Sequence, residues 1–138
     1  MLSNLELKRV RGDWKEILDH EERFSEEFYR QLFQRDPQLK HLFQRSLEMQ
    51  KRKLVSMFSA AFDSFDQPRE LFPLLRMAGR RHNQYAVKPD DYKTMEEAFM
   101  AAIASVLGDK MDTSHRQSWH KAFNDVAKLM QGDAPDLS

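Results

Sequence analysis

Apolar residues recur along this sequence at intervals of three and four, which places their side chains on one face of an α-helix. Leu7, Val10 and Trp14 form the first such series. The pattern predicts six or seven helical stretches. We place them at residues 4–20, 24–35, 37–43, 46–65, 71–82, 89–108 and 113–130.

Capping residues and prolines fix the expected ends of several helices. Ser3 offers an N-cap for the first helix, and Pro37 ends the second because proline disfavours helix in the residue before it. Pro89 suits the first turn of a later helix. No repeat, low-complexity tract or long linker divides the chain. We therefore expect one domain over residues 1–138, with residues 131–138 fraying.

Composition favours an all-α fold and limits the function classes. The chain has 41% hydrophobic residues but only 4 glycines and 5 prolines, little material for a turn-rich β fold. Basic and acidic residues balance at 22 each, so no net field draws the protein to nucleic acid or an anionic membrane. The lack of cysteine excludes disulfides, thiolate metal sites and covalent haem attachment. Without a signal-like start or a long uncharged apolar run, we expect a cytoplasmic protein.

His82 continues an apolar stripe. By their spacing Leu71, Leu75, Ala78 and His82 share one face of a predicted helix, whereas Arg81 points elsewhere. An imidazole among apolar side chains is disfavoured as a cation, and both ring nitrogens need partners. A metal on one nitrogen and a carbonyl on the other would satisfy both. A core-edge histidine hydrogen-bonded to backbone fits the same spacing, so this residue alone leaves both interpretations open.

Two more polar residues fall on predicted apolar faces. Gln50 lies between Leu47 and Leu54, and Tyr29 lies beside Phe28 on an aromatic face. A buried carboxamide without a partner costs about 1–3 kcal/mol, and a buried tyrosine hydroxyl also seeks one. Each could contact the other or a bound ligand, or Gln50 could reach water at the rim of the core.

Other polar groups give weaker signals. His115 and His120 lie five residues apart, too far around a helix for a two-histidine metal site, and we expect both at the surface. The basic run of Lys51, Arg52 and Lys53 is expected to be a solvated face, although Lys53 could reach an anionic group at a pocket edge.

Six short motifs follow one another along the chain. They are Phe28-Tyr29 to Phe33, Asp36-Pro37, Leu42-Phe43, Gln50 with Leu54, Gly79 to His82, and Val87-Lys88-Pro89. In this order and spacing they resemble the globin family, in particular flavohaemoglobin modules and single-domain bacterial haemoglobins. The resemblance covers the chain from Trp14 to Met130 and implies six to eight helices around a haem pocket.

The resemblance also implies roles around haem b: an axial iron ligand, residues facing a bound gas, and residues against the ring or its propionates. The implied residues are His82 as ligand; Tyr29 and Gln50 facing the gas; Phe43, Leu54, Val87 and Phe99 against the ring; and Lys53, Arg45 and Arg81 near the propionates. His82 is thereby interpreted as the iron ligand. Dioxygen, nitric oxide and carbon monoxide are the expected gases.

One family feature is incomplete here. In flavohaemoglobin-type modules a tyrosine and a glutamate back the iron-binding histidine, and Tyr92 matches the tyrosine while the glutamate position falls near Ala134. We therefore expect an oxygen-binding histidine rather than a peroxidase-like one. No flavin- or nicotinamide-binding region follows residue 138, so we expect any turnover to need a separate reductase.

Four function classes fit the sequence. We expect first reversible gas binding with slow oxygen release, and second nitric oxide dioxygenation or another haem redox activity. Gas or redox sensing ranks third. The non-globin alternative is a haem-free helical interaction domain. We expect a monomer or weak homodimer that binds neither nucleic acid nor membrane.

Overall fold

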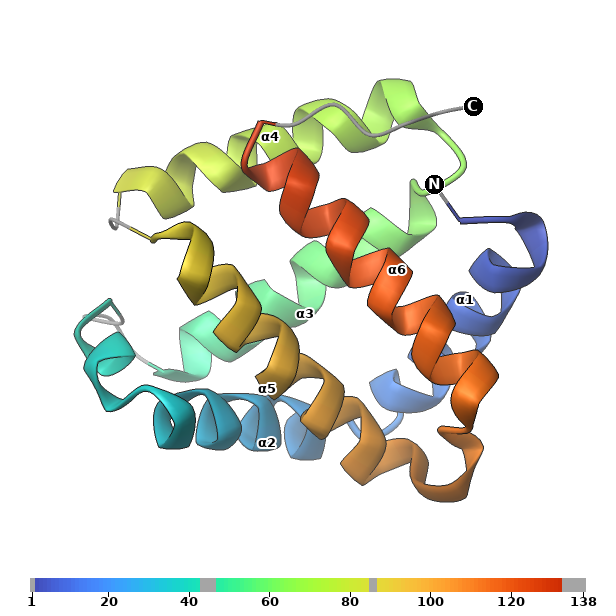
Figure 1. Cartoon of the computed structure of the whole chain (residues 1–138), viewed down its shortest axis with the longest axis horizontal. Coiled ribbons are helices and arrows are strands. Elements are labelled where there is room, and N and C mark those ends of the chain that lie inside the picture. Colours follow the sequence, from blue (N-terminus) through green and yellow to red (C-terminus); the bar gives the residue numbers. More distant parts are fainter. Residues whose placement is uncertain (1, 43–46, 85–86, 133–138) are drawn as a thin grey trace.

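The computed structural model describes residues 2–42, 47–84 and 87–132, and this part of the chain is helical without strands. The elements are α1 (Asn4–Leu18), α2 (Glu21–Arg35), η1 (Pro37–Leu42), α3 (Leu47–Asp63), α4 (Pro68–Gln84), α5 (Pro89–Leu107), η2 (Gly108–Lys110) and α6 (Thr113–Met130) (Figure 1). The prediction of an all-α fold is confirmed. Each of the seven predicted stretches begins and ends within three residues of one of these elements.

Local chemistry explains where the helices begin and end. The Glu6 N–H donates to Ser3 Oγ at 3.2 Å, and the Ser3 N–H donates to the Glu6 carboxylate at 3.0 Å, a capping box that starts α1. α5 begins at Pro89, and Gly108 follows its end at a φ of 57°, a conformation that favours glycine. At the start of α6, Asp112 Oδ1 accepts from the His115 N–H at 2.9 Å.

The helix α4 is longer than the apolar stripe predicts. It begins at Pro68 rather than at Leu71, because a proline in the first turn of a helix loses no hydrogen bond. Pro73 lies inside it. Since proline has no N–H, the carbonyl of Arg69 loses its helical partner there, which weakens α4 one turn after its start.

Each helix packs against at least two others. α2 packs mainly on α5, and α6 packs on α4, α1 and α5 (Figure 1). α1, α2 and α3 also contact one another. An aromatic cluster fills the centre. The ring of Phe99 lies 4.5 Å from that of Phe58, 5.6 Å from Phe24 and 5.8 Å from Trp119, measured between centroids.

The helix α3 carries two parallel rows of inward side chains rather than the single stripe that the sequence predicts. The buried row is Val55, Phe58 and Phe62, and Phe65 continues it just after the helix ends. The second row is half-buried: Gln50, Leu54 and Met57. Only the first row is covered by aromatic neighbours such as Trp14, whose ring centroid is 5.1 Å from that of Phe62. The half-buried row is the one that the predicted site residues occupy.

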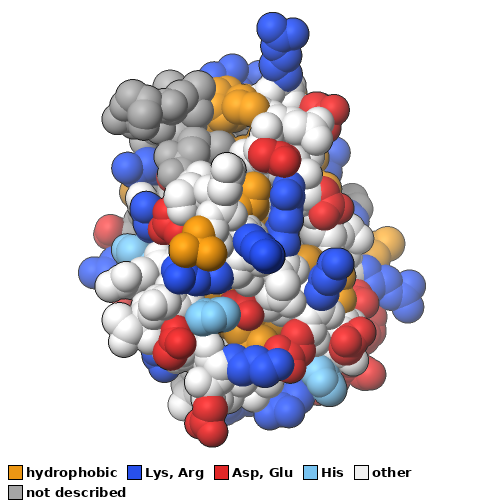
Figure 2. All heavy atoms as spheres, turned by 90° about the vertical axis from the view of Figure 1, so that its right-hand side faces the viewer, with side chains coloured by type: hydrophobic (Ala, Val, Ile, Leu, Met, Phe, Trp, Pro, Cys, Tyr) orange, Lys and Arg blue, Asp and Glu red, His pale blue; other side chains and the backbone are white. Residues whose placement is uncertain are grey.

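Positively and negatively charged side chains are mixed on the face shown in Figure 2, which is the right-hand side of Figure 1. Several pairs link different elements. Arg11 lies 2.9 Å from the Asp66 carboxylate, and Lys110 lies 2.9 Å from that of Glu16. In the described ranges no helix is both long enough and apolar enough to cross a membrane.

Candidate functional site

Tyr29 is a buried polar side chain at the junction of α2 and α3. Its exposed fraction is 4%, and its ring packs edge-on against Phe28 at 5.1 Å and beside Phe33 at 5.8 Å. Its hydroxyl donates to the backbone carbonyl of Gln50 at 3.3 Å. Burial raises the pKa of the Tyr29 hydroxyl far above its ordinary value, so the group stays protonated and remains a hydrogen-bond donor.

The hydrogen bond between the Tyr29 hydroxyl and the Gln50 carbonyl joins the two polar residues that the sequence singles out. Gln50 lies in the first turns of α3, half-buried, with Leu54 one turn later in the same row. The sequence raised the option that Tyr29 and Gln50 contact each other, and they do, through the backbone of Gln50 rather than its carboxamide. At 3.3 Å this hydrogen bond is longer than is usual for a hydroxyl donor.

His82 lies near the end of α4, in the position that continues a buried face. Leu71 and Leu75 are fully buried, and Ala78 packs against the core, so the predicted stripe holds up to the turn before the histidine. The side chain of His82 lies outside the described part. The predicted roles of Phe43 and Arg45 likewise fall on residues outside the described ranges.

The remaining predicted residues occupy different surroundings. Val87, just before α5, is half-buried, whereas Lys53 and Arg81 are exposed. Arg81 Nη2 lies 4.0 Å from the Met77 sulfur. Phe99 has no exposed surface and belongs to the central aromatic cluster, so core packing alone accounts for its burial.

The ends of four helices gather on the left-hand side of Figure 1: the C-terminal ends of α2 and α4 and the N-terminal ends of α3 and α5. Half-buried apolar side chains lie at these ends, namely Phe33, Leu54, Ala78, Val87 and Met95. Tyr92, near the start of α5, is buried there too, which raises the pKa of its hydroxyl.

One expectation about a charged side chain was wrong. Lys51 is not on a solvated face: its side chain is 12% exposed, and its Nζ lies 3.2 Å from the Glu48 carboxylate and 4.0 Å from that of Glu26 on α2. The side chain of His115 is partly exposed, at 26%, and makes a contact that the sequence did not predict. Its Nδ1 lies 2.7 Å from Oδ2 of Asp13, which also accepts from Trp119 Nε1 at 2.9 Å. The signal was present in Asp13, which falls on the apolar face of α1.

Comparison with known proteins decides the family. The sequence profile described as Globin matches residues 26–130. This chain belongs to the globin family. The globin is 26% identical to a flavohemoprotein of Bacillus subtilis strain 168 over 99% of its own length and 35% of that protein. It is 25% identical to a flavohemoprotein of Halalkalibacterium halodurans over 82% of its length and 28% of that protein.

A solved structure has the same fold over nearly its whole length. It is an engineered carbene transferase, a candidate nitric oxide dioxygenase from Rhodothermus marinus, with a TM-score of 0.85 and 29% identity. The match covers 96% of this globin and 92% of that chain. By contrast, this globin spans about a third of the length of the two flavohemoproteins.

Proposed function

We propose that this globin binds haem b and, through it, reversibly binds dioxygen and other diatomic gases, with slow release of oxygen. The observation that carries the proposal is the buried Tyr29 hydroxyl, held protonated beside α3, where it donates to the Gln50 carbonyl at 3.3 Å. Family membership supports the cofactor. When bound, haem supplies the iron that a gas ligates.

The residues present fit such a cofactor. Leu54 and Met57 form an apolar row on α3 that remains half-buried, although it faces away from solvent-exposed Lys53 and Arg52. A flat apolar group beside that row would complete its burial. By its spacing His82 continues the buried stripe of Leu71 and Leu75 along α4, and imidazole is a common axial ligand of haem iron.

We assign the other residues by the same reasoning. His82 would hold the iron, and Leu54, Val87 and Phe43 would pack against the ring, with Phe99 behind them. Lys53 and Arg81 are exposed cations that would meet the propionates at the solvent edge. Residues 1–138 would act as one globin domain.

Tyr29 is the residue that would slow gas release. Its O–H would leave the Gln50 carbonyl and donate to the gas, while the Gln50 carboxamide would supply a second donor. Each hydrogen bond would contribute about 1–3 kcal/mol, which corresponds to roughly tenfold to a hundredfold slower dissociation.

Titration of the cofactor-free protein with haemin tests the proposal. The parent should develop a Soret band at one haemin per chain, and His82→Ala should change the position of that band. His120→Ala is the matched control, because His120 is an exposed histidine on α6 that pairs with Glu96. A parent without a Soret shift, or a His82→Ala spectrum identical to that of the parent, contradicts the assignment.

A second function is favoured by the similar proteins. The R. marinus protein is described as a candidate nitric oxide dioxygenase, and the sequence relatives are flavohemoproteins. We propose as the alternative that this globin converts nitric oxide and dioxygen to nitrate, one electron per turnover coming from a separate reductase.

Nitrate yield separates the two functions. The haem-loaded protein would be supplied with nitric oxide, oxygen, a soluble flavin reductase and its nicotinamide donor. Sustained nitrate formation in excess of the protein supports the enzyme. A single stoichiometric burst that does not depend on the reductase supports gas binding alone.

A further inference from the structure

Helices α4 and α6 touch backbone to backbone at Gly79. A Cβ added at Gly79 would sit 1.7 Å from the carbonyl oxygen of Met130 and 2.5 Å from its carbonyl carbon. Non-bonded carbon atoms need about 3.5 Å, so any larger residue would force the two helices apart by roughly 1.5–2 Å. Because the opposing atoms belong to the backbone, no side-chain rotation can relieve the clash.

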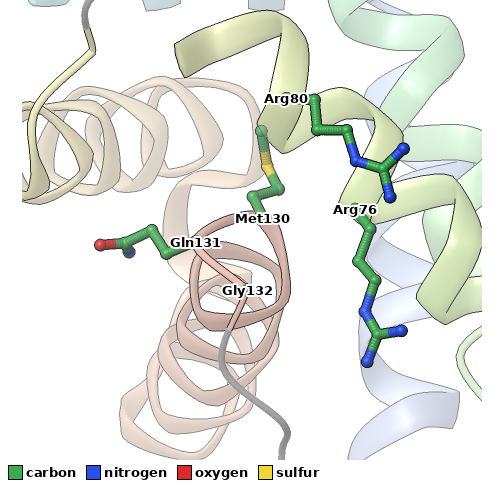
Figure 3. A pocket seen from close by; sticks show the side chains of 5 residues that line it. All are labelled: Arg76, Arg80, Met130, Gln131 and Gly132. Carbon is green, nitrogen blue, oxygen red and sulfur yellow. The ribbon is translucent and has the colours of Figure 1, made fainter.

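The surroundings of this contact are shown in Figure 3. The Met130 side chain points toward α4, and Arg76 and Arg80 extend from α4 past the end of α6. These residues and Gly132 line a pocket of about 200 Å³. Of the side chains in Figure 3, only that of Met130 is buried, so the tight packing at this junction belongs to the two backbones.

The segment of α4 that carries His82 directly follows this contact. Gly79 is buried, whereas Arg80 and Arg81 are exposed, so Gly79 is the last described buried residue before the histidine. His82 follows it by three residues, about 4.5 Å along the helix. Pro73 interrupts the hydrogen bonding on the other side of Gly79. α6 is also the main packing partner of α4.

We propose that Gly79 is a positioning residue. Its backbone contact with Met130 sets the distance between α4 and α6, and thereby the position of the His82 segment and the geometry of the iron–imidazole bond. The inference rests on the proposed role of His82 as iron ligand. Helices transmit small displacements because protein interiors are close-packed, so a shift at residue 79 moves the following turn with it.

The test compares alanine at two helical glycines. Gly79→Ala should shift the iron–histidine stretching band of the ferrous haem protein and speed haem loss to a haem-free acceptor globin at least tenfold. Gly12→Ala is the matched control, since a Cβ at Gly12 in α1 meets nothing within 4 Å. It should leave the band and the rate of haem loss unchanged.

Met130→Ala separates positioning from loosening. It removes a buried side chain but keeps the backbone atoms that oppose Gly79. It should lower the stability of the cofactor-free protein without moving the stretching band. If Met130→Ala shifts the band as far as Gly79→Ala does, general loosening explains the effect and the proposal is wrong.

Gly132→Ala is a milder second variant if Gly79→Ala does not fold. Gly132 has a φ of 89°, which strains any other residue, while its added Cβ meets nothing within 4 Å. The strain should displace the end of α6, including Met130, and shift the stretching band in a folded protein. An unchanged band in every variant that folds overturns the proposal.

A detached ligand distinguishes failure of this inference from failure of the proposed function. In His82→Gly loaded with free imidazole, the ligand is no longer attached to α4, so adding Gly79→Ala should leave the iron–imidazole band where it is. A parent-like band in His82→Gly without imidazole refutes the ligand assignment itself. A shift by Gly79→Ala that persists with free imidazole refutes only the positioning role.

Discussion

Several polar atoms of this globin lie inside apolar surroundings. Tyr29 and Asp13 are buried and bonded, whereas Asp125 Oδ2 has no hydrogen-bond partner among the described residues. Burying such a group costs free energy unless a partner or a proton compensates it. We therefore expect different effects on gas release and on stability when the polar atoms of these three residues are removed.

Tyr29→Phe removes the donor and keeps the ring. If the hydroxyl stabilises bound oxygen, the variant should release oxygen about tenfold to a hundredfold faster in stopped-flow measurements. Ser25→Ala removes another buried hydroxyl from α2, one that donates to the Glu21 carbonyl within the helix, and should change the rate much less. Equal rates in the parent and in Tyr29→Phe would rule out the assigned role.

Asp125→Asn should stabilise the protein near neutral pH. Burial raises the pKa of the Asp125 carboxyl above 3.8, only partly offset by Lys128 and Lys121. The folded state therefore holds the proton to a higher pH than the unfolded chain, and stability is lost as pH rises through these pKa values. Since the group is half-buried, the gain at pH 7 should be at most about 1 kcal/mol.

Chemical denaturation of the parent and Asp125→Asn from pH 3 to 8 measures this difference. The gap in free energy of unfolding should open as pH rises from 3 and stay constant above the pKa of the folded state. A gap that widens toward acid would contradict the assigned sign.

At the scale of helices, the sequence pattern predicted where each helix lies and ends better than it predicted which of its faces is buried. Ser3, Pro37 and Pro89 marked ends correctly because capping and proline sterics are local. Spacing alone could not tell the two rows of α3 apart, since Leu54 and Val55 are both apolar and only the neighbouring helices decide which one is covered. The extension of α4 to Pro68 was missed because its first turn lacks an apolar stripe.

The contact between α1 and α6 is held by a buried carboxylate. Asp13→Asn should lower the free energy of unfolding by about 2–3 kcal/mol, because Asp13 accepts from both His115 and Trp119. In a double-mutant cycle, Asp13→Asn and His115→Ala should show coupling of about 1 kcal/mol. His120→Ala, the exposed control, should stay within about 0.5 kcal/mol of the parent. Additive effects in the cycle would show that the Asp13–His115 contact adds no stability.

For the whole molecule, the sequence predicted the family and the nearness of Tyr29 and Gln50, because both follow from motifs in a fixed order. It could not predict the contact of Gly79 with Met130, which joins helices 51 positions apart in the chain and depends on atoms that a glycine lacks. His115 was missed for the same reason, since its partner Asp13 is distant in sequence.

Cofactor binding should stabilise the entire fold. A ligand that binds only the native state adds about 4 kcal/mol at a thousand times its dissociation constant, so the haem-loaded protein should unfold at a higher temperature than the cofactor-free one. Circular dichroism during heating measures the difference, which should be smaller in His82→Ala. An equal gain in His82→Ala would show that the histidine contributes nothing to haem affinity.

Both tryptophans of the chain occupy one place in the fold. The rings of Trp14 and Trp119 lie 6.3 Å apart, 4% and 0% exposed, where α1 meets α6. Intrinsic fluorescence therefore reports on that junction alone, while helical circular dichroism averages over all elements. If the region around α4 opens first, the ellipticity will fall while the emission still comes from buried indoles, and the protein itself will reveal a partly unfolded state without any attached dye.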